Sequence, residues 1–454
     1  MAEIIRQTHR LPTVRIGFQP SRAGGLVLFD SFDGGEMVSR QECPATDIGI
    51  QPELNVRAYR DVIFHMSEAL CSAIGDSLKA IAPDESPLWL QVGSSSGHLA
   101  VVPWERLLHG SLNAPVLRIP NFITDPVLPR GPIRMVLCLS SPRAKTPFDL
   151  VGYVHEFVAT AEHALPSGAE LHLFTDLGSY DSVSGLEKSG PFNVRVHNPR
   201  DAEAFGIGGN DRRLEHRTAV VKSPWLHWMI EALGGASVAA VHFVCPGYFS
   251  RDQGALALAR SPTDNYDSDW SHFVGAEELI AFLNQVGAWY TGFSPPHDNV
   301  WAIGLRLLAD RIVWQRPGAL LLHDTAGGGL DELLEAFRFL FTGGDAMPPR
   351  SPYIVMYCHP ARLPQYRYQF SNFESVKPYG LTEPEMTRPE FDELALKMSA
   401  SAAAEDVAQV GWQQSGLRMM DQILLQSKGK DTATQLGTLD ALNRLSSLFE
   451  DGDS

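Results

Sequence analysis

The sequence predicts an α/β protein whose central domain, residues 129–360, has a mainly parallel sheet of six strands between layers of helices. Two observations predict this class. Short apolar segments alternate with segments of helical length through this range, which is the pattern of right-handed βαβ units. One apolar segment, residues 238–244 (VAAVHFV), is nearly continuous, as in a strand covered on both faces. We expect an N-terminal α+β subdomain over residues 1–128 and a C-terminal helical region over residues 361–454.

The N-terminal region is expected to combine two hairpins with one long helix. Apolar and β-branched residues beside glycine-containing turns predict the hairpins. Their strands are expected at residues 14–18, 26–29, 88–92 and 99–102. Between the hairpins, apolar residues recur at helical spacing from residue 59 to residue 81, and Pro83 ends this helix. The Gly-Ser turn at residues 93–97 lacks the Lys-Ser/Thr pair of a phosphate-binding loop, so we interpret it as a hairpin turn.

The central domain is predicted from the alternation of the two kinds of segment. The six strands are expected at residues 133–139, 170–174, 238–244, 288–293, 318–322 and 353–357, and residues 192–196 are an option for a further short strand at an edge. Helices are expected at residues 154–165, 225–233, 276–286, 300–314 and 330–341. Each helix is long enough to form the crossover between two parallel strands.

Composition narrows the classes of function. At 454 residues the chain is long enough for two or three domains, and 44% hydrophobic with 20% charged residues is typical of a soluble globular protein. A formal charge of -16 argues against nonspecific nucleic-acid binding, because no positive field attracts phosphates. The five scattered cysteines form no CxxC pair, so neither a disulfide framework nor a metal site is expected, and no cofactor is indicated. No apolar run reaches the length of a membrane span and no signal peptide is evident, so we expect a cytoplasmic protein.

The strand at residues 238–244 ends abruptly at Pro246, which cannot donate a hydrogen bond to a neighbouring strand. In open α/β sheets, ligands and catalytic groups gather at the carboxyl ends of the strands. We therefore expect the functional site, if there is one, at this turn.

Several short motifs resemble the CHAT family, a branch of the caspase-like cysteine peptidases that is also related to separase. Residues 99–108 (LAVVPWERLL) are similar to the family's hairpin ending in Pro-Trp-Glu-x-Leu. Residues 241–249 (VHFVCPGYF) resemble its strand ending of the form VHFxxHG, and residues 318–324 with the helix ending at residue 341 resemble a later strand and helix. The resemblance covers roughly residues 55 to 345 and implies a caspase-like α/β/α sandwich.

The resemblance also implies where catalytic residues would lie, and this chain departs from the family at both positions. Pro246 stands where the family has its general-base histidine, and the strand at residues 288–294, where the family has its catalytic cysteine, contains none. A thiol needs a nearby base to become a nucleophilic thiolate, and a proline side chain cannot accept a proton. We expect a degenerate pocket formed by Pro246, Gly247, Gly292, Phe293 and Ser294.

Other residues near this edge are weaker candidates for catalysis: Cys245, His242, His297 and His323. Cys245 and His242 are three residues apart on one strand, so their side chains point to opposite faces and cannot form a dyad directly. Cys245 is most simply a small buried hydrophobic residue, and His242 a satisfied core residue. Two alternatives to an inactive protein remain: a hydrolase, including a cysteine peptidase, with a relocated nucleophile, and a ligand-sensing module that uses the vacated cleft.

The C-terminal region ends in a stripe of apolar residues at helical spacing, which either packs on its own domain or docks into a partner protein. The stripe consists of Leu436, Leu439, Leu442, Leu445, Leu448 and Phe449. By resemblance to the family, we expect a catalytically inactive pseudo-peptidase that serves as an adaptor, regulatory subunit or recruited substrate in a bacterial stress, cell-death or anti-phage assembly. Its partners would be proteins, such as an active peptidase or a sensor, with oligomerisation as an option and without nucleic acid or membrane.

Overall fold

The structure is a computed structural model of the chain. It describes residues 11–19, 25–33, 36–50, 63–81, 87–92, 97–110, 114–120, 132–140, 142, 148–205, 220–250, 253–263, 271–296, 299–316, 318–325, 327–341 and 346–363. All of these residues belong to one compact unit, residues 1–376. The expected C-terminal helical region, with its leucine stripe, lies outside the described residues.

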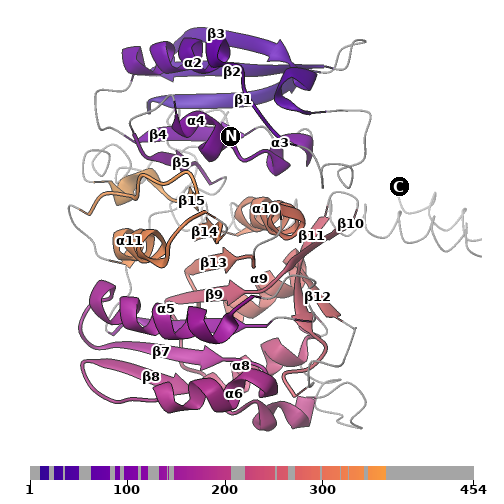
Figure 1. Cartoon of the computed structure of the whole chain (residues 1–454), viewed down its shortest axis with the longest axis vertical. Helices are drawn as coiled ribbons and strands as arrows, with labels where there is room; N and C mark the ends of the chain where they lie inside the picture. Colours follow the sequence, from indigo (N-terminus) through magenta and orange to yellow (C-terminus); the bar gives the residue numbers. More distant parts are fainter. Residues whose placement is uncertain are drawn as a thin grey trace, which may run out of the picture. The chain divides into compact units, whose positions relative to one another are not determined.

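The predicted α/β class is confirmed, and the main sheet is large and mixed (Figure 1). Twelve strands are hydrogen-bonded in the order β3-β2-β1-β4-β5-β15-β14-β13-β9-β6-β7-β8. Their bounds are β1 (Thr13–Gln19), β2 (Leu26–Asp33), β3 (Glu36–Pro44), β4 (Leu88–Val92), β5 (Val116–Arg118), β6 (Arg134–Leu139), β7 (Ala169–Phe174), β8 (Phe192–Val196), β9 (Ala240–Val244), β13 (Tyr290–Ser294), β14 (Ala319–His323) and β15 (Ile354–Tyr357).

Strand direction divides the sheet into two parallel blocks. Strands β14, β13, β9, β6, β7 and β8 pair in parallel with their neighbours, and so do β1, β4, β5 and β15. Strands β14 and β15 are antiparallel, as are β1 with β2 and β2 with β3. The strands of the N-terminal region thus continue the central sheet, through the pairing of Tyr357 in β15 with Arg118 in β5.

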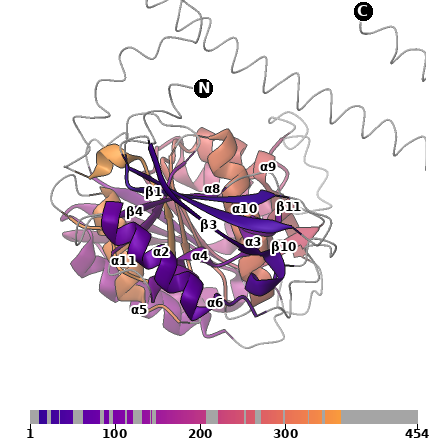
Figure 2. The same ribbon diagram turned by 90° about the horizontal axis from the view of Figure 1, so that it is seen from above.

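Helices cover both faces of the sheet (Figure 2). Helices α5 (Leu150–Ala164) and α11 (Leu330–Phe341) pack on one face, and α8 (Pro224–Leu233), α9 (Ala276–Gln285) and α10 (Asn299–Gln315) pack on the other. Helix α10 also contributes Ile303 and Leu307 to a third core, beneath β1, β2 and α2 (Glu68–Ile81). The remaining helices are α3 (Gly97–Val101), α4 (Trp104–His109), α6 (Leu177–Val183), η1 (Ala45–Ile48), η3 (Ser184–Leu186), η4 (Pro199–Phe205) and η5 (Pro360–Arg362).

Local chemistry explains where these elements start and stop. Asp149 caps α5 by accepting a 2.8 Å hydrogen bond from the backbone N–H of Gly152. Helix α8 begins with Pro224, which needs no N–H partner in the first turn, and ends at Gly234, whose φ of 58° is left-handed. Strand β9 ends at Val244, two residues before Pro246, as expected.

The structure corrects two predicted elements. Residues 97–101 form helix α3 and not the return strand of a hairpin, because β4 already has parallel partners on both sides, β1 and β5. The helix expected from residue 59 begins only at Glu68, and residues 63–67 are not helical. Strands β3 and β5 were not predicted.

A second sheet, also not predicted, follows directly after Pro246. Its antiparallel strands are β10 (Gly247–Ser250), β11 (Gln253–Ala259) and β12 (Ser271–Gly275), with β11 in the middle. Two glycines let this sheet lie against the backbone of α10. A Cβ on Gly254 would collide with the carbonyl oxygen of Gly304, and one on Gly304 would come within 2.7 Å of the carbonyl oxygen of Tyr248. Close contact between strand and helix therefore requires both glycines.

Among the described residues, no helix combines the length and apolar character needed to cross a lipid bilayer.

Candidate functional site at the carboxyl ends of the central strands

The carboxyl ends of β9, β13 and β14 lie side by side at one edge of the sheet. Parallel pairing places Gly292 beside His242 and Ser294 beside Val244. In the next strand, Phe293 pairs with Leu322, one residue before His323. Of the residues considered from the sequence, the structure brings together three side chains, those of His242, Ser294 and His323.

Ser294 is the centre of a buried hydrogen-bond network. Its Oγ lies 2.8 Å from Nε2 of His242, 3.3 Å from Nδ1 of His323 and 3.3 Å from the hydroxyl of Tyr153 on α5. Nε2 of His323 lies 3.2 Å from the carbonyl oxygen of Gly328. His242 also stacks against Phe157, with ring centroids 6.2 Å apart.

These contacts fit one assignment of protons. The carbonyl oxygen of Gly328 only accepts, so Nε2 of His323 carries the proton and Nδ1 accepts from Ser294. Because the serine has one proton to give, Nε2 of His242 donates to Ser294 Oγ, and Tyr153 donates to its other lone pair. Nδ1 of His242 then carries no proton, in agreement with its having no hydrogen-bond partner within the described structure.

Burial keeps both imidazoles neutral. Desolvation lowers the pKa of His242 to about 3, and the proximity of His323 adds to the effect. Desolvation likewise lowers the pKa of His323 to about 4, although its contact with Gly328 opposes the shift. Neither Ser294 nor His242 exposes any surface. The arrangement holds a serine hydroxyl next to a neutral histidine, which is the chemistry of a general-base pair, but it is closed to solvent.

The other predicted site residues do not join this network. Cys245 has no exposed surface and packs on the opposite face from His242, where burial raises the pKa of its thiol well above the usual range. Pro246 is buried, and its carbonyl oxygen accepts a 2.8 Å hydrogen bond from the backbone N–H of Ala257. Gly247 begins β10. Phe293 also faces the side of Cys245 and stacks on Phe243.

Gly292 has a specific steric role. A Cβ at this position would collide with Nδ1 of His242, so the imidazole can lie over β13 only because residue 292 has no side chain. His297 lies outside the described residues.

A small cleft borders the network. It has a volume of about 20 Å³, room for about one water molecule. Its lining includes His323 and Asp324 at the end of β14, Pro295 after β13, and Glu105 and Arg306. His323 therefore faces the cleft and contacts Ser294.

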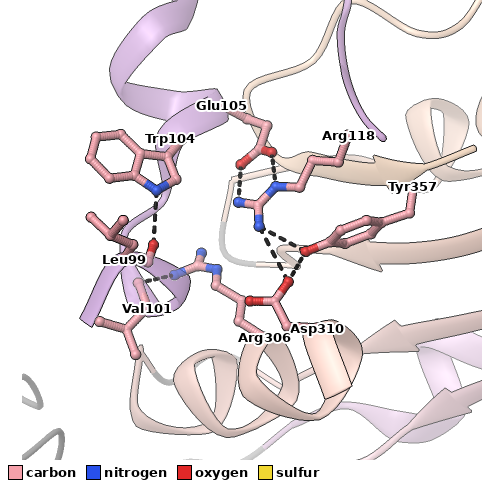
Figure 3. Close-up of polar contacts among 8 residues, drawn as sticks. All are labelled: Leu99, Val101, Trp104, Glu105, Arg118, Arg306, Asp310 and Tyr357. Atoms are coloured by element: carbon pink, nitrogen blue, oxygen red, sulfur yellow. Dashed lines mark hydrogen bonds and ion pairs between the residues drawn. The ribbon is translucent and has the colours of Figure 1, made fainter. Parts of the chain in front are cut away.

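Behind the cleft, Glu105 belongs to a buried ion cluster that joins α4, β5, α10 and β15 (Figure 3). Arg118 binds both carboxylate oxygens of Glu105, at 2.6 and 3.1 Å, and donates to the hydroxyl of Tyr357 at 2.8 Å. Nη1 of Arg118 also lies 3.6 Å from Oδ1 of Asp310, to which Tyr357 donates a hydrogen bond. Glu105 is the glutamate of the PWE motif, so in this fold the motif supplies a structural ion pair.

Nearby groups keep Arg118 charged in spite of its burial. Burial alone would lower the pKa of Arg118, but Glu105, Tyr357 and Asp310 outweigh it and hold that pKa above its ordinary value. Burial raises the pKa of Asp310, against the opposing effect of Arg118. Nearby, Arg306 donates a 3.2 Å hydrogen bond to the carbonyl oxygen of Val101, and burial lowers its pKa.

Sequence reasoning missed Tyr153, Arg118, Asp310 and Tyr357. Tyr153 and Asp310 lie on helices, where the spacing of apolar residues does not distinguish them from their neighbours. Arg118 is the last residue of a strand of only three residues. The sequence offers no signal that these side chains converge, since 239 positions separate Arg118 from Tyr357.

Comparisons with protein-family models and with curated proteins find no match to this chain. Among the described residues, no group of three or more His, Cys, Asp or Glu side chains is placed to hold a metal ion.

Proposed function

We propose that this chain is a catalytically inactive CHAT-type protein with a caspase-like fold. It acts by binding other proteins, as an adaptor, regulatory subunit or recruited substrate in a bacterial stress, cell-death or anti-phage assembly. The proposal rests on the motif resemblance of residues 99–108 and 241–249 and on the chemistry at the carboxyl ends of β9 and β13. A block of parallel strands with helices on both faces supports the caspase-like sandwich.

The observation that carries the proposal is the burial of every candidate nucleophile at this edge. Peptide-bond cleavage by a cysteine needs a thiolate that a substrate carbonyl can reach. The thiol of Cys245 is buried, its pKa is raised, and His242 lies on the other face of the sheet. Pro246 offers no base, and the adjoining cleft has a volume of only about 20 Å³.

Peptide cleavage tests the catalytic half of this proposal. We expect no specific cleavage when the full chain is incubated with a proteome-derived peptide library and the products are read by mass spectrometry. Specific cleavage that Cys245→Ala abolishes would overturn the proposal.

Protein binding is tested by affinity capture of the tagged chain from its native cells. The predicted docking stripe gives matched variants: Leu442→Glu places a charge on the stripe, and Asn443→Glu places the same charge one residue away from it. We expect a partner that the wild-type chain and the Asn443→Glu variant retain and the Leu442→Glu variant loses. A partner that all three retain would exclude the stripe as the docking element, while failure to capture any partner would count against the adaptor role.

The hydrogen bond from Ser294 to His323 favours one second candidate, a serine hydrolase. His323 would take the hydroxyl proton, and the donors His242 and Tyr153 would stabilise the oxygen as negative charge develops on it. A fluorophosphonate probe tests this candidate, because it labels activated serines. Labelling that is lost in Ser294→Ala but kept in Ser261→Ala would favour the hydrolase over the inactive protein.

A further inference from the structure

The two ends of the twelve-stranded sheet differ in how their backbone groups are paired. At one end, Val194 of β8 forms an antiparallel bridge with Lys188, and the two residues exchange backbone hydrogen bonds of 2.9 and 3.1 Å. At the other end, β3 pairs only with β2 among the described residues (Figure 1). Every second residue of an edge strand directs its N–H and C=O groups away from its neighbour, so β3 can accept a further strand.

The side chains of β3 alternate between the core and solvent. Cys43 is buried in the core beneath α2, and Ser39 and Gln41 on the same face are half-buried. The opposite face carries four exposed side chains, those of Val38, Arg40, Glu42 and Pro44. The pairing of β3 with β2 is regular from Ser39 to Pro44, so this part of the edge is an ordinary extended strand.

The order of charges on the exposed face fits a second copy of the same strand. When two identical strands pair in antiparallel fashion about a two-fold axis, one residue faces itself and its neighbours face each other in reverse order. With Gln41 on the axis, Arg40 faces Glu42 of the second copy, and symmetry forms this pair twice. An axis at Arg40 or at Glu42 would place a charge against its own copy. An axis at Ser39 would place Glu36 against Glu42.

A bulge argues against the one other axis that brings opposite charges together. An axis at Val38 would place Glu36 against Arg40. However, the register with β2 shifts between Ser31 and Phe32, which leaves Val38 as the extra residue of a bulge. A bulge interrupts the regular alternation of backbone groups that a continuous pairing needs. The regular stretch from residue 39 to residue 44 therefore favours the axis at Gln41.

Arg40 is held in place for such a contact. Its Nε and Nη2 donate to the two carboxylate oxygens of Asp30, at 2.6 and 2.9 Å. These bonds fix the guanidinium over the sheet and leave its third nitrogen, Nη1, unused by Asp30. The side chain nevertheless remains 49% exposed. A carboxylate that arrives from a second copy therefore meets an oriented cation that loses little conformational freedom on binding.

We propose that two copies of this chain form a dimer in which their β3 strands pair antiparallel about Gln41 and join the two sheets into one. Backbone hydrogen bonds along residues 38–44 hold the strands together, and the two pairs between Arg40 and Glu42 set the register. Val38 and Pro44 of opposite copies meet at the ends of the paired stretch. The inference is independent of the proposed function, because it requires neither a catalytic site nor a different partner protein.

Sedimentation velocity of the full chain over a range of concentrations tests the dimer. Glu42→Arg places an arginine against Arg40 of the other copy, and Arg40→Glu places a glutamate against Glu42. The control, Glu36→Arg, makes the same change of charge as Glu42→Arg on the same strand, outside the paired stretch. Circular dichroism spectra that match the wild-type spectrum establish that the variants fold. Glu42→Arg carries the test alone if Arg40→Glu does not fold, because it keeps the ion pair of Arg40 with Asp30.

We expect the wild type and Glu36→Arg to dimerise equally, and each of the other two variants to raise the dissociation constant of the dimer about tenfold or more. An equal mixture of Glu42→Arg and Arg40→Glu should dimerise like the wild type, because each arginine then faces a glutamate. A wild type that sediments as a monomer at every concentration would overturn the proposal. So would a dimer that Glu42→Arg leaves intact, an equal loss in Glu36→Arg, or a mixture of two folded variants that stays monomeric.

Discussion

Two polar clusters lie on the same sheet, and they differ in how their buried groups are stabilised. The cluster around Ser294 is neutral, because desolvation lowers the pKa of both histidines and keeps their imidazoles uncharged. The cluster around Arg118 is ionic, because carboxylates and a guanidinium compensate one another at short distance. Burial by itself therefore does not decide whether a group is charged; the presence of an opposite charge within hydrogen-bond distance does.

The two clusters also differ in how completely their polar atoms are paired. The ionic cluster ties four elements together, and its acceptors and donors are used by protein groups. The neutral cluster retains one ring nitrogen, Nδ1 of His242, without a partner among the described residues. A neutral network costs less to rearrange than an ionic one.

The largest expected effect is on the ionic cluster. Arg118→Met leaves the buried carboxylate of Glu105 and the partly buried carboxylate of Asp310 without their guanidinium, and we expect the free energy of unfolding to fall by about 3–5 kcal/mol. Urea unfolding followed by circular dichroism measures the loss. As a control, Lys79→Met breaks an exposed ion pair with Asp76 and should change stability by less than about 0.5 kcal/mol. A loss for Arg118→Met as small as that of the control would show that the cluster contributes no net stability.

Acid should destabilise the neutral cluster. The folded-state pKa of His242 is about 3, below the ordinary value of 6.5. Between these two pH values the unfolded chain therefore binds a proton at His242 and the folded chain does not. The stability due to neutral His242 is complete above pH 6.5 and is lost as the pH falls toward 3, at about 1.4 kcal/mol per pH unit. Between pH 6.5 and 4.5, the wild type should lose about 2 kcal/mol more stability than His242→Leu.

Urea titrations at several pH values test this difference in slope. Tyr153→Phe serves as the control, since it removes one hydrogen bond of the same network without removing a histidine. We expect its pH profile to run parallel to that of the wild type. A His242→Leu profile that is also parallel would mean that His242 takes up a proton as readily in the folded chain as in the unfolded chain.

The next largest loss of stability is expected from steric crowding in the neutral cluster. Gly292→Ala would force a methyl group against the His242 ring, and we expect a destabilisation of about 2 to 3 kcal/mol. Gly185→Ala is the matched control, because a Cβ there meets no atom within 4 Å. Thermal unfolding of both variants distinguishes the two positions. Equal melting temperatures would place the imidazole of His242 away from β13.

The smallest effect is expected from Ser294→Ala. The substitution removes the central hydroxyl and leaves Tyr153 and both histidines short of one partner, at a cost of about 1–2 kcal/mol. Ser294→Cys keeps a weak donor and acceptor at the same place and should cost less. If Ser294→Ala were neutral in stability, the network would contribute to something other than folding, and the fluorophosphonate assay would become the more informative measurement.

Local sequence signals predicted most of the central elements. The run of apolar residues in β9 and the proline after it predicted a buried strand and its end, and both are observed. Residues 97–101 were assigned wrongly, because a short apolar segment fits a strand or a helix equally well and only the parallel partners of β4 decide. Strands β10 to β12 were not predicted, although β11 has seven residues.

The site was less predictable than the fold. His242, Ser294 and His323 each drew attention in the sequence, but their meeting depends on the register between β9, β13 and β14, which local patterns do not contain. The sequence likewise marked Glu105 through its motif and did not show that Arg118, 13 residues later, is its partner. Contacts of this kind arise from topology, so they become visible only when the strand order is known.

Helix α10 connects the three-stranded sheet to the ion cluster around Arg118. Gly304 touches the backbone of β10 at Tyr248, and Asp310, six positions further on, is part of the ion cluster. Six residues of helix span about 9 Å, so the two contacts lie within less than two turns of one rigid rod. At Gly304 the backbone of α10 packs directly on the backbone of β10, so no side chain between them can adjust when β10 moves. A displacement of β10 would therefore press directly on the backbone of α10, the helix that carries Asp310.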